Sequence, residues 1–321
     1  MKKYWINLVL ALIIPGAAVA AEATFPPQQI RVIVPFTPGG PTDLIGRLVA
    51  KGLQEKLKVP VVVENRGGAS AIIGAEAVAR STPDGSTLLF NATHHVTNPV
   101  FFKSLPYDTK ADFSPIALVA GMASALVVNP QKVPARSVSE LISLAKEKPD
   151  QLSMATFGGA NQLSSALFEF MAGVEIEDIN YKGAAPALND VIAGHVPMMF
   201  NSLVTVAPHV QAGKILALGV TDSKRSSLMP EVPTIAEAGP LPGYEAVAWF
   251  GLFMPRDKDN EVSEKLAAVM KEVLAGSEFR EQLKKMGAEP GTIVGEDFQK
   301  FVDAELVKWA QVGARAGIKK Q

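Results

Sequence analysis

Three glycine pairs, each placed just before a helical pattern, are the residues in this sequence best suited to bind a ligand. In the first pair, Gly39 and Gly40 stand between a β-branched run and Pro41. Proline is favoured at the first helical position because its missing N–H would have no partner there, so we predict Gly40 as the N-cap and a helix from Pro41. Glycine lets a ligand approach the backbone, and the N–H groups at a helix start favour an anion. This segment therefore indicates a site for a carboxylate or phosphate that needs neither Arg nor Lys.

Asp43 is the residue of this segment that opposes an anion, because a second negative charge would repel it. We expect its carboxylate to turn back and cap the N–H groups at the helix start. On these residues alone, an ordinary tight turn between a strand and a helix remains the alternative.

The second glycine pair resembles the first in kind. Gly158 and Gly159 follow a predicted strand over residues 152–157, and we expect a helix from about Leu163 with Asn161 as its N-cap. Neutral side chains that can form hydrogen bonds stand near this helix start, namely Asn161, Gln162, Ser164 and Ser165.

The third pair, Gly67 and Gly68, precedes a helix predicted at about residues 71–80. Several glycine-rich helix starts suit a site between two domains that holds an anionic ligand at both ends. Spacing alone leaves their convergence open.

Polar residues also follow the predicted strand over residues 86–91. Asn91 ends the strand, and Thr93, His94 and His95 come shortly after it. The carboxyl ends of strands are where open α/β sheets bind ligands, so we expect one histidine to reach the ligand. A loop histidine bonded to the backbone is the alternative.

The sequence lacks the patterns that carry the common catalytic chemistries. It contains no G-x-S-x-G, no H-E-x-x-H, no Walker A and no G-x-G-x-x-G segment. None of its four histidines stands at helical i, i+4 spacing from another, and the absence of cysteine excludes thiol nucleophiles, disulfides and Cys-ligated metal centres. We therefore predict no catalytic residue, no metal site and no cofactor.

Length and charge limit the class of protein. The 321 residues suggest about two domains. The 31 Lys and Arg residues against 32 Asp and Glu residues give a net charge of −1, which argues against a nucleic-acid partner because such a partner needs a concentrated basic footprint. With 48% apolar and 20% charged residues, the chain is predicted to be globular.

The first 20 residues have the three-part layout of a secretory signal peptide. Lys2 and Lys3 give a positive start, residues 5–14 are an apolar run too short for a membrane span, and residues 18–20 are a small-x-small cleavage site. An uncleaved anchor is the alternative. Cleavage after Ala20 would remove the two lysines and change the net charge from −1 to −3.

An alternation of strands and helices must position these segments. Short β-branched runs predict strands over residues 30–36, 59–64, 86–91, 125–129, 152–157, 196–201 and 215–221. Apolar residues at helical spacing lie between most of them, and further apolar stripes predict that the C-terminal third is helical. The alternation indicates parallel sheets covered by helices on both faces. We find no internal repeat in the sequence.

From about Pro27 onward, the chain resembles the substrate-binding proteins of tripartite tricarboxylate transporters, also called the Bug family. The resemblance is carried by the strings PFTPGGPTDLIGRLVA (35–50), VVENRGGASAIIGAEAVARSTPDGSTLL (62–89), LPYDTKADFSPIALVA (105–120), YKGAAPALNDVIAGHVPMMF (181–200) and PEVPTIAEAGPLPGYEAVAWFGLFMP (230–255). Each string is moderately specific, and their common order and spacing make the assignment.

The resemblance implies an α/β, two-lobe Venus-flytrap fold in the periplasm of a Gram-negative bacterium. The chain would cross between the lobes twice, near residues 127–130 and 248–251. Lobe 1 would comprise residues 25–125 and 250–321, and lobe 2 residues 126–249. Such receptors capture a small carboxylate and deliver it to a membrane permease, and we expect a monomer.

The resemblance also implies ligand contacts from loops of both lobes, many of them through backbone amides and water. One loop would supply Phe36, Thr37, Gly39, Gly40 and Thr42, and the other Thr156, Gly158, Gly159, Asn161 and Gln162. The turn that would close one side of the cleft consists of Gly183, Ala184, Ala185 and Pro186. The expected specificity contacts are Asn91, Thr93, His94, His95, Asn201 and Ser202.

Three departures from the family pattern lie in or beside these contacts. The second loop, TFGGANQL at residues 156–163, is shorter than the usual S-P-G-x-G-T-x-x-H-L and has Gln162 where a histidine is usual. Residues 65–68 are N-R-G-G in place of the common N-R-P-G, and the adjacent His94 and His95 are unusual. The resemblance therefore specifies the fold more closely than the substrate.

Together these observations predict a periplasmic receptor that holds a small organic acid, most simply a dicarboxylate, between two closing lobes. Three alternatives remain open. The ligand is an aromatic carboxylate of the phthalate or terephthalate kind, flanked by Phe36, Phe157 and Trp249; or the protein presents its ligand to a signalling kinase; or it is an exported hydrolase that uses His94 and His95 as acid and base.

Overall fold

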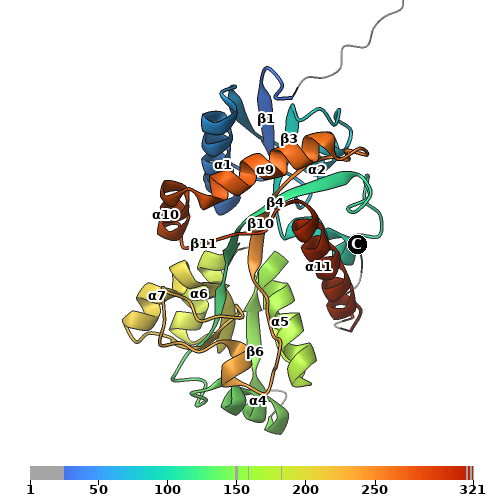
Figure 1. The fold of residues 1–321 in the computed structure, drawn as a ribbon. Coiled ribbons are helices and arrows are strands. Elements are labelled where there is room, and N and C mark those ends of the chain that lie inside the picture. Colours follow the sequence, from blue (N-terminus) through green and yellow to red (C-terminus); the bar gives the residue numbers. More distant parts are fainter. Residues whose placement is uncertain are drawn as a thin grey trace, which may run out of the picture.

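The computed structural model describes residues 25–148, 151–157, 159–181, 183–315, 317–318 and 320, and the strands of this part of the chain form two sheets (Figure 1). The expected signal peptide, residues 1–20, lies outside the described residues. All the strands predicted from the sequence are present, each close to its expected bounds. In these strands alternate side chains enter the cores on the two faces of the sheet, as Val32 and Ile33 do.

The first sheet holds the N-terminal glycine loop. Within the described residues its six strands, in spatial order, are β2 (Val61–Asn65), β1 (Ile30–Val34), β3 (Thr87–Ala92), β10 (Ala248–Pro255), β4 (Phe113–Met122) and β11 (Glu289–Pro290). One face packs against α1 (Pro41–Leu57), α9 (Glu261–Ala275) and α10 (Ser277–Lys285). The other face packs against α2 (Ile72–Ala79), α3 (His94–Phe101) and α11 (Gly295–Arg315).

The second sheet leads into the loop that contains the second glycine pair, residues 158–159. Its five strands among the described residues are, in spatial order, β7 (Glu177–Asn180), β6 (Ser153–Thr156), β8 (Met198–Ser202), β5 (Ser124–Val128) and β9 (Leu216–Val220). Helices α6 (Ala184–Ala193) and α7 (Leu203–Gln211) cover one face. The other face is covered by α4 (Val138–Glu147), α5 (Gly159–Ala172) and α8 (Ile235–Ala238).

The two sheets repeat one arrangement. In order and direction, β2, β1, β3, β10 and β4 correspond to β7, β6, β8, β5 and β9. β10 in the first sheet and β5 in the second are each antiparallel to both neighbours, because each comes from the chain that has just crossed from the other sheet; the two-residue β11 is also antiparallel to β4. The expectation of parallel sheets is therefore met by β1, β2 and β3 and by β6, β7 and β8, whereas the remaining pairings are antiparallel and make both sheets mixed. The sequence shows this repeat only in short matches such as Phe90-Asn91 and Phe200-Asn201.

The chain changes sheet twice. Met122 still pairs within the first sheet, whereas Ser124 already pairs with Ser202 in the second. The first crossing therefore precedes the expected residues 127–130, because β5 belongs wholly to the second sheet. The return is complete at Ala248, which pairs with Met122 and so lies at the start of the expected segment 248–251.

Thr221 ties the two crossing segments together. Its Oγ1 accepts a hydrogen bond from the N–H of Ser124 at 2.8 Å, and its carbonyl accepts one from the N–H of Ala246 at 2.9 Å. The crossings are therefore adjacent, as a hinge between two lobes requires.

The strand directions decide where the helices that follow them begin. β4 runs toward the second sheet because it leads into β5, so β10 runs back, and β3 and β1 run toward the second sheet. By the same argument β8 and β6 run toward the first sheet. The carboxyl ends of β1 and β3 therefore face those of β6 and β8, and α1, α3, α5 and α7 begin in the space between the sheets.

We call the first sheet with its helices the first half of the protein, and the second sheet with its helices the second half. The C-terminal helix α11 links the two halves on one side of this hinge (Figure 1). It packs against α3 and β4 of the first half and against α5 of the second. The buried Glu305 accepts hydrogen bonds from the indole N–H groups of Trp249 and Trp309, each at 2.9 Å. The guanidinium of Arg315 lies 4.4 Å from the ring centre of Phe170 in α5. None of the helices in the described part of the chain has the length and apolar character needed to cross a membrane.

Candidate ligand-binding site

The first helix start has the geometry that its sequence predicts. Gly40 is the N-cap of α1 in an extended conformation and Pro41 is the first helical residue, so both predictions are confirmed. Gly39 has a φ of 87°, which glycine adopts readily. A Cβ added at Gly39 would meet no atom within 4 Å, so a ligand has room to approach this backbone.

Asp43 turns back toward this loop, as predicted. Its Oδ2 accepts the N–H of Gly39 at 2.9 Å, and its Oδ1 accepts the Nδ2 of Asn65 at 2.8 Å. Arg47, one turn along α1, forms an ion pair with the same carboxylate at 2.9 Å. Burial raises the pKa of Asp43, but the hydrogen bonds from Arg47, the Gly39 N–H and Asn65 outweigh it and hold this pKa below its usual value. The carboxylate is therefore charged, buried and neutralised by its own partners.

Backbone N–H groups in the first turn of α1 remain available. Among the described residues, those of Thr42 and Asp43 have no hydrogen-bond partner, as is usual where a helix begins. The dipole of α1 adds a partial positive charge at the same place. This helix start can therefore bind an anion although no free cationic side chain belongs to it.

The first and third glycine pairs lie together. A Cβ added at Gly67 would stand 3.4 Å from the carbonyl carbon of Phe36 and the nitrogen of Thr37, so the two loops pack backbone against backbone. Asn65, just before the third pair, donates a hydrogen bond to the carbonyl of Phe36 at 3.1 Å. Phe36 and its loop are thus held by the end of β2.

The second helix starts earlier than predicted. α5 begins at Gly159 and not at about Leu163, so Asn161 is its third residue and not its N-cap. Gln162 is half-buried on the first turn. Gly158 lies outside the described residues.

Asn161 does for the second loop what Asp43 does for the first. Its Oδ1 accepts the N–H of Phe157, four residues earlier, at 3.0 Å, and its Nδ2 donates to the carbonyl of Phe200. Gly39 is likewise four residues before Asp43. A side-chain acceptor at the third helical position can bind the N–H that precedes the cap, just as an acceptor at the N-cap can bind one inside the helix. The sequence alone therefore favours Asn161 as the N-cap and predicts the helix start too late.

The strands before the two loops also correspond. Val34 pairs with Asn65 and accepts the N–H of Arg66 on its carbonyl at 2.9 Å. Thr156 pairs with Asn180 in the same way, accepts the N–H of Tyr181 at 2.7 Å and donates from its Oγ1 to the Oδ1 of Asn180 at 3.0 Å. Thr156 is fully buried. Asn65 and Asn180 were not predicted as site residues, although Asn65, like Asn91, stands at the end of a predicted strand.

The segment expected to close one side of the cleft is a helix start. Gly183 is the N-cap of α6, and Ala184, Ala185 and Pro186 form its first turn. Ala185 and Pro186 are exposed. A ligand contact from this segment stays a prediction.

Asn91 and Asn201 occupy equivalent places at the carboxyl ends of β3 and β8. Each Oδ1 accepts the N–H of the next residue, Ala92 or Ser202, at 2.8 Å. Both asparagines are buried, and the Nδ2 of Asn91 has no partner among the described residues. Ser202 is half-buried at the N-cap of α7. A buried amide without a partner is a group that a ligand or an ordered water completes.

His95 and Thr93 belong to the interior of the first half, which corrects the expectation of ligand contacts from them. The His95 ring has no exposed surface and lies between the rings of Phe113 and Phe253, with centre distances of 4.9 and 4.1 Å. Burial lowers the pKa of His95 to about 3, so the ring is neutral. The Oγ1 of Thr93 accepts the N–H of Trp249 at 2.9 Å and so anchors the second crossing.

His94 is the histidine that stays beside the first loop. Its half-buried ring stands edge-on to that of Phe36, with 5.1 Å between the ring centres. Of the aromatic residues considered as walls for a ring-shaped ligand, Phe36 and Phe157 are half-buried, whereas Trp249 is buried and bonded to Glu305.

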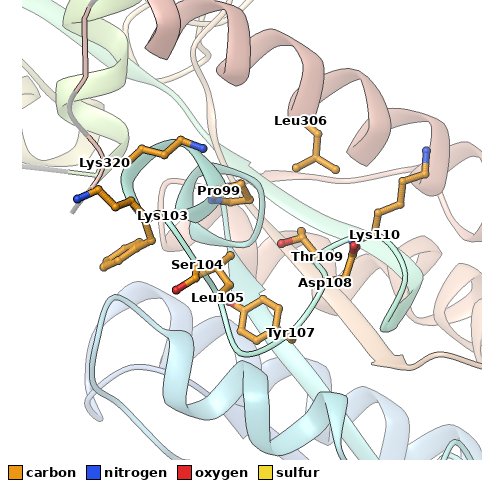
Figure 2. A pocket seen from close by; sticks show the side chains of 11 residues that line it. Pro99, Lys103, Ser104, Leu105, Tyr107, Asp108, Thr109, Lys110, Leu306 and Lys320 are labelled. Atoms are coloured by element: carbon orange, nitrogen blue, oxygen red, sulfur yellow. The ribbon is translucent and has the colours of Figure 1, made fainter.

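Other hollows lie away from the two loops. A cavity of about 330 Å³ lies between the end of α3 and α11 (Figure 2), with lysines at its rim and apolar side chains such as Leu105 and Leu306 in its wall. Another, of about 490 Å³, lies between the two halves beside the first crossing and is lined by residues 222–228 and by the end of α10. Among the described residues no group of three or more His, Asp or Glu is placed to hold a metal ion.

A comparison with families and curated proteins matches nearly the whole chain. The family model described as "Tripartite tricarboxylate transporter family receptor" matches residues 45–318. Protein BugT of Bordetella pertussis is 34% identical over 318 residues, which cover 97% of this chain and 97% of that protein.

Solved structures show the same architecture. "R. palustris Rpa4515 with adipate" is 36% identical, with a TM-score of 0.75 over 93% of this chain and 100% of that one. "MatC (Rpa3494) from Rhodopseudomonas palustris with bound malate" is 32% identical, with a TM-score of 0.70 over 90% of this chain and 100% of that one. The α/β two-lobe fold predicted from the resemblance is confirmed.

Proposed function

Because the chain belongs to the family of tripartite tricarboxylate transporter receptors, we propose that it binds a dicarboxylate between its two lobes and delivers it to a membrane permease of that transport system. As a member of this family it is a periplasmic solute-binding protein. The dicarboxylate and the delivery step are the parts that we propose.

The observation that carries the proposal is the pair of helix starts at the facing edges of the two sheets. In both α1 and α5 the third helical residue holds the loop before the helix, through Asp43 and Asn161. First-turn N–H groups and the helix dipole favour an anion at each start. A ligand with an acidic group at each end can engage both lobes at once, and this favours the closed arrangement by differential affinity.

Two similar proteins support an acid of this kind. The structures of Rpa4515 and MatC are described with adipate and with malate, and both ligands carry two carboxylates. The aromatic alternative is weaker because Trp249, one of its three expected walls, is buried and bonded to Glu305. The hydrolase alternative loses its acid–base pair because His95 lies in the core.

We also propose the lobe boundaries, the export and the oligomeric state of the protein. The pairing of the strands supports lobe boundaries at Ala123 and shortly before Ala248, so that lobe 1 comprises the chain before and after this stretch. We propose that residues 1–20 are cleaved on export and that the mature protein acts as a monomer in the periplasm.

The test is a thermal-shift assay on residues 21–321 after unfolding and refolding to remove any co-purified ligand. The panel contains adipate, succinate, malate, citrate, glutamate, benzoate and the phthalate isomers. A ligand at 100 times its Kd adds about 2.7 kcal/mol, which raises the Tm by several degrees for domains of this size. We expect this shift with aliphatic dicarboxylates and a smaller one with benzoate.

A refolded protein with native secondary structure and no shift for any acid would refute carboxylate binding. Delivery to a permease is tested in the source bacterium, where deletion of the gene should abolish uptake of the identified acid. Loss of gene induction with intact uptake would instead identify a sensory receptor.

A further inference from the structure

One polar side chain in the space between the lobes has no counterpart in the other half. His94 is the first residue of α3 and follows the carboxyl end of β3, three residues after Asn91. The equivalent residue of the second half, three after Asn201, is Val204. Val204 packs closely on Gly287, at which a Cβ would clash with it. The two halves therefore differ here in both polarity and contacts.

The imidazole of His94 is free to bind. It makes no hydrogen bond and no ion pair with any residue that the structure describes, whereas His195 lies 3.4 Å from a carboxylate oxygen of Asp190. Its contact is the edge-on packing against Phe36, which belongs to the first glycine loop. A half-buried ring with unpaired nitrogens beside a backbone anion site can bond to a ligand held in that site.

We propose that His94 selects the ligand at the lobe 1 side of the cleft, by donating a ring N–H to one acidic group while Phe36 packs on a hydrocarbon spacer. This inference rests on the proposed function. It favours unsubstituted dicarboxylates such as adipate over the hydroxylated malate, because the hydroxyl of malate would lose its water against the Phe36 ring without gaining a partner there.

The charge state of His94 links this contact to pH. Burial lowers the pKa of His94, so the ring is neutral in the free protein at pH 7. A bound dianion favours the imidazolium, so binding should take up a proton and strengthen as the pH falls toward 6. The titratable groups on the surrounding elements are otherwise engaged or neutral: Asp43 with Arg47, Glu64 with Arg66, Glu76 with Arg80, Glu169 with Ser165, Glu305 with Lys308, and the buried His95.

The experiment compares wild-type residues 21–321 with His94→Ala, His94→Gln and the control His195→Ala. Isothermal titration calorimetry with adipate, succinate and malate is run at pH 7.5 and pH 6.0, in two buffers of different ionisation enthalpy so that proton uptake is measured directly. His195 lies on the exposed surface of lobe 2, so its variant reports any general effect of losing a histidine.

We expect His94→Ala to lower the affinity for adipate about tenfold and to reduce the preference for adipate over malate, which is the loss of one good hydrogen bond. His94→Gln should keep affinity at pH 7.5 within about threefold but abolish proton uptake, because an amide donates without titrating. His195→Ala should bind like the wild type.

Unchanged affinity, selectivity and proton uptake in both His94 variants, with a wild type that binds adipate, would overturn this inference and leave the proposed function intact. If His94→Ala fails to fold, His94→Gln and the wild-type pH dependence decide the matter. A wild type that binds none of the acids would refute the proposed function itself.

Discussion

The starts of α1 and α5 have the same hydrogen-bonding arrangement but use different side chains for it. In each, the third helical residue accepts the N–H found four positions earlier, Gly39 at 2.9 Å and Phe157 at 3.0 Å. In α1 the acceptor is Asp43, whose charge is compensated by Arg47 and Asn65. In α5 it is the neutral Asn161, whose second arm bonds to the Phe200 carbonyl. Both loops are therefore held by a side-chain oxygen at the third helical position, and this oxygen can belong to a charged or to a neutral side chain.

The two halves also differ in the titratable groups that they bury. The first half encloses His95, whose pKa is lowered to about 3 by burial. The second half partly buries Glu169 and Asp178, whose pKa values burial raises to about 7 and about 6, with the charge of Asp178 adding to the shift of Glu169. The two halves share one strand order, yet the group buried in the first half should lower its stability at low pH, whereas the groups buried in the second half should lower its stability at high pH.

The largest effect is expected from giving the second helix start the charge of the first. Asn161→Asp removes the side-chain donor to the Phe200 carbonyl and adds a carboxylate to α5. In α1 the carboxylate of Asp43 is compensated by Arg47, four residues later, but the corresponding residue of α5 is the neutral Ser165. We expect the affinity for an acid ligand to fall about 100-fold, or roughly 2.7 kcal/mol, because the added charge repels the ligand without compensation. Calorimetric titration with the acid found in the thermal-shift panel measures it.

The matched control is Gln211→Glu, which adds the same charge to an exposed position at the end of α7. Its affinity should stay within about twofold of the wild type, since exposed charges are screened by salt. Equal affinities in Asn161→Asp and wild type would show that the second helix start does not bind the acid.

The reciprocal change, Asp43→Asn, should separate stability from binding. It breaks the ion pair with Arg47 and leaves the N–H of Gly39 or the amide of Asn65 without its acceptor, and position 43 itself is buried, so the free energy of unfolding should fall by about 2 kcal/mol. Acid affinity should not fall, because no negative charge is added. Denaturant unfolding and calorimetry measure the two quantities.

Asp303→Asn is the control for this change, because the half-buried Asp303 pairs with the exposed Lys110 at the surface and the loss of this pair should cost less than about 1 kcal/mol. A large drop in acid affinity with Asp43→Asn would mean that the carboxylate positions the ligand directly.

Acid should weaken the first half selectively. The folded pKa of His95 lies below its unfolded value of about 6.5, so the unfolded chain binds the extra proton and stability is lost as the pH falls below 6.5. The loss should be about 1 kcal/mol between pH 6.5 and 5.5. Hydrogen exchange of β4 and β10, which enclose His95, compared with that of β6 and β8, measures it.

His95→Leu should remove this pH dependence, since leucine has no proton to bind. A dependence that persists unchanged in the variant would assign it to another group. Faster exchange in β6 and β8 at low pH would contradict the difference between the two halves.

Alkaline pH should weaken the second half, with the smallest effect of the four. The folded pKa values of Glu169 and Asp178 lie above their unfolded values, so their stabilisation is complete below about pH 4 and is lost as the pH rises through 6 and 7. Asp178→Asn should therefore slow the hydrogen exchange of β7 at pH 8 relative to wild type. The free energy of opening should rise by less than about 1 kcal/mol at pH 8 and change little at pH 5.

Asp190→Asn gives the contrast, because the hydrogen bond from Tyr181 and then that from His195 lower the pKa of Asp190. This variant should lose stability at pH 8. The same sign in both variants would refute the pH assignment for the second half.

The sequence by itself determined the local geometry of the first loop and the existence of the predicted strands. Gly40, Pro41 and Asp43 interact with residues a few positions away, so a short window contains all the partners that decide the conformation. The order of the family strings likewise sufficed for the two-lobe fold, which the comparisons confirm.

Tertiary structure alone decided which side chains reach the space between the lobes. His94 and His95 are adjacent in the sequence, yet one lies beside Phe36 and the other between Phe113 and Phe253. That difference depends on β4, β10 and the first loop, which are far from α3 in the chain. Burial and pairing are set by contacts of high sequence separation, and no short window of residues contains them.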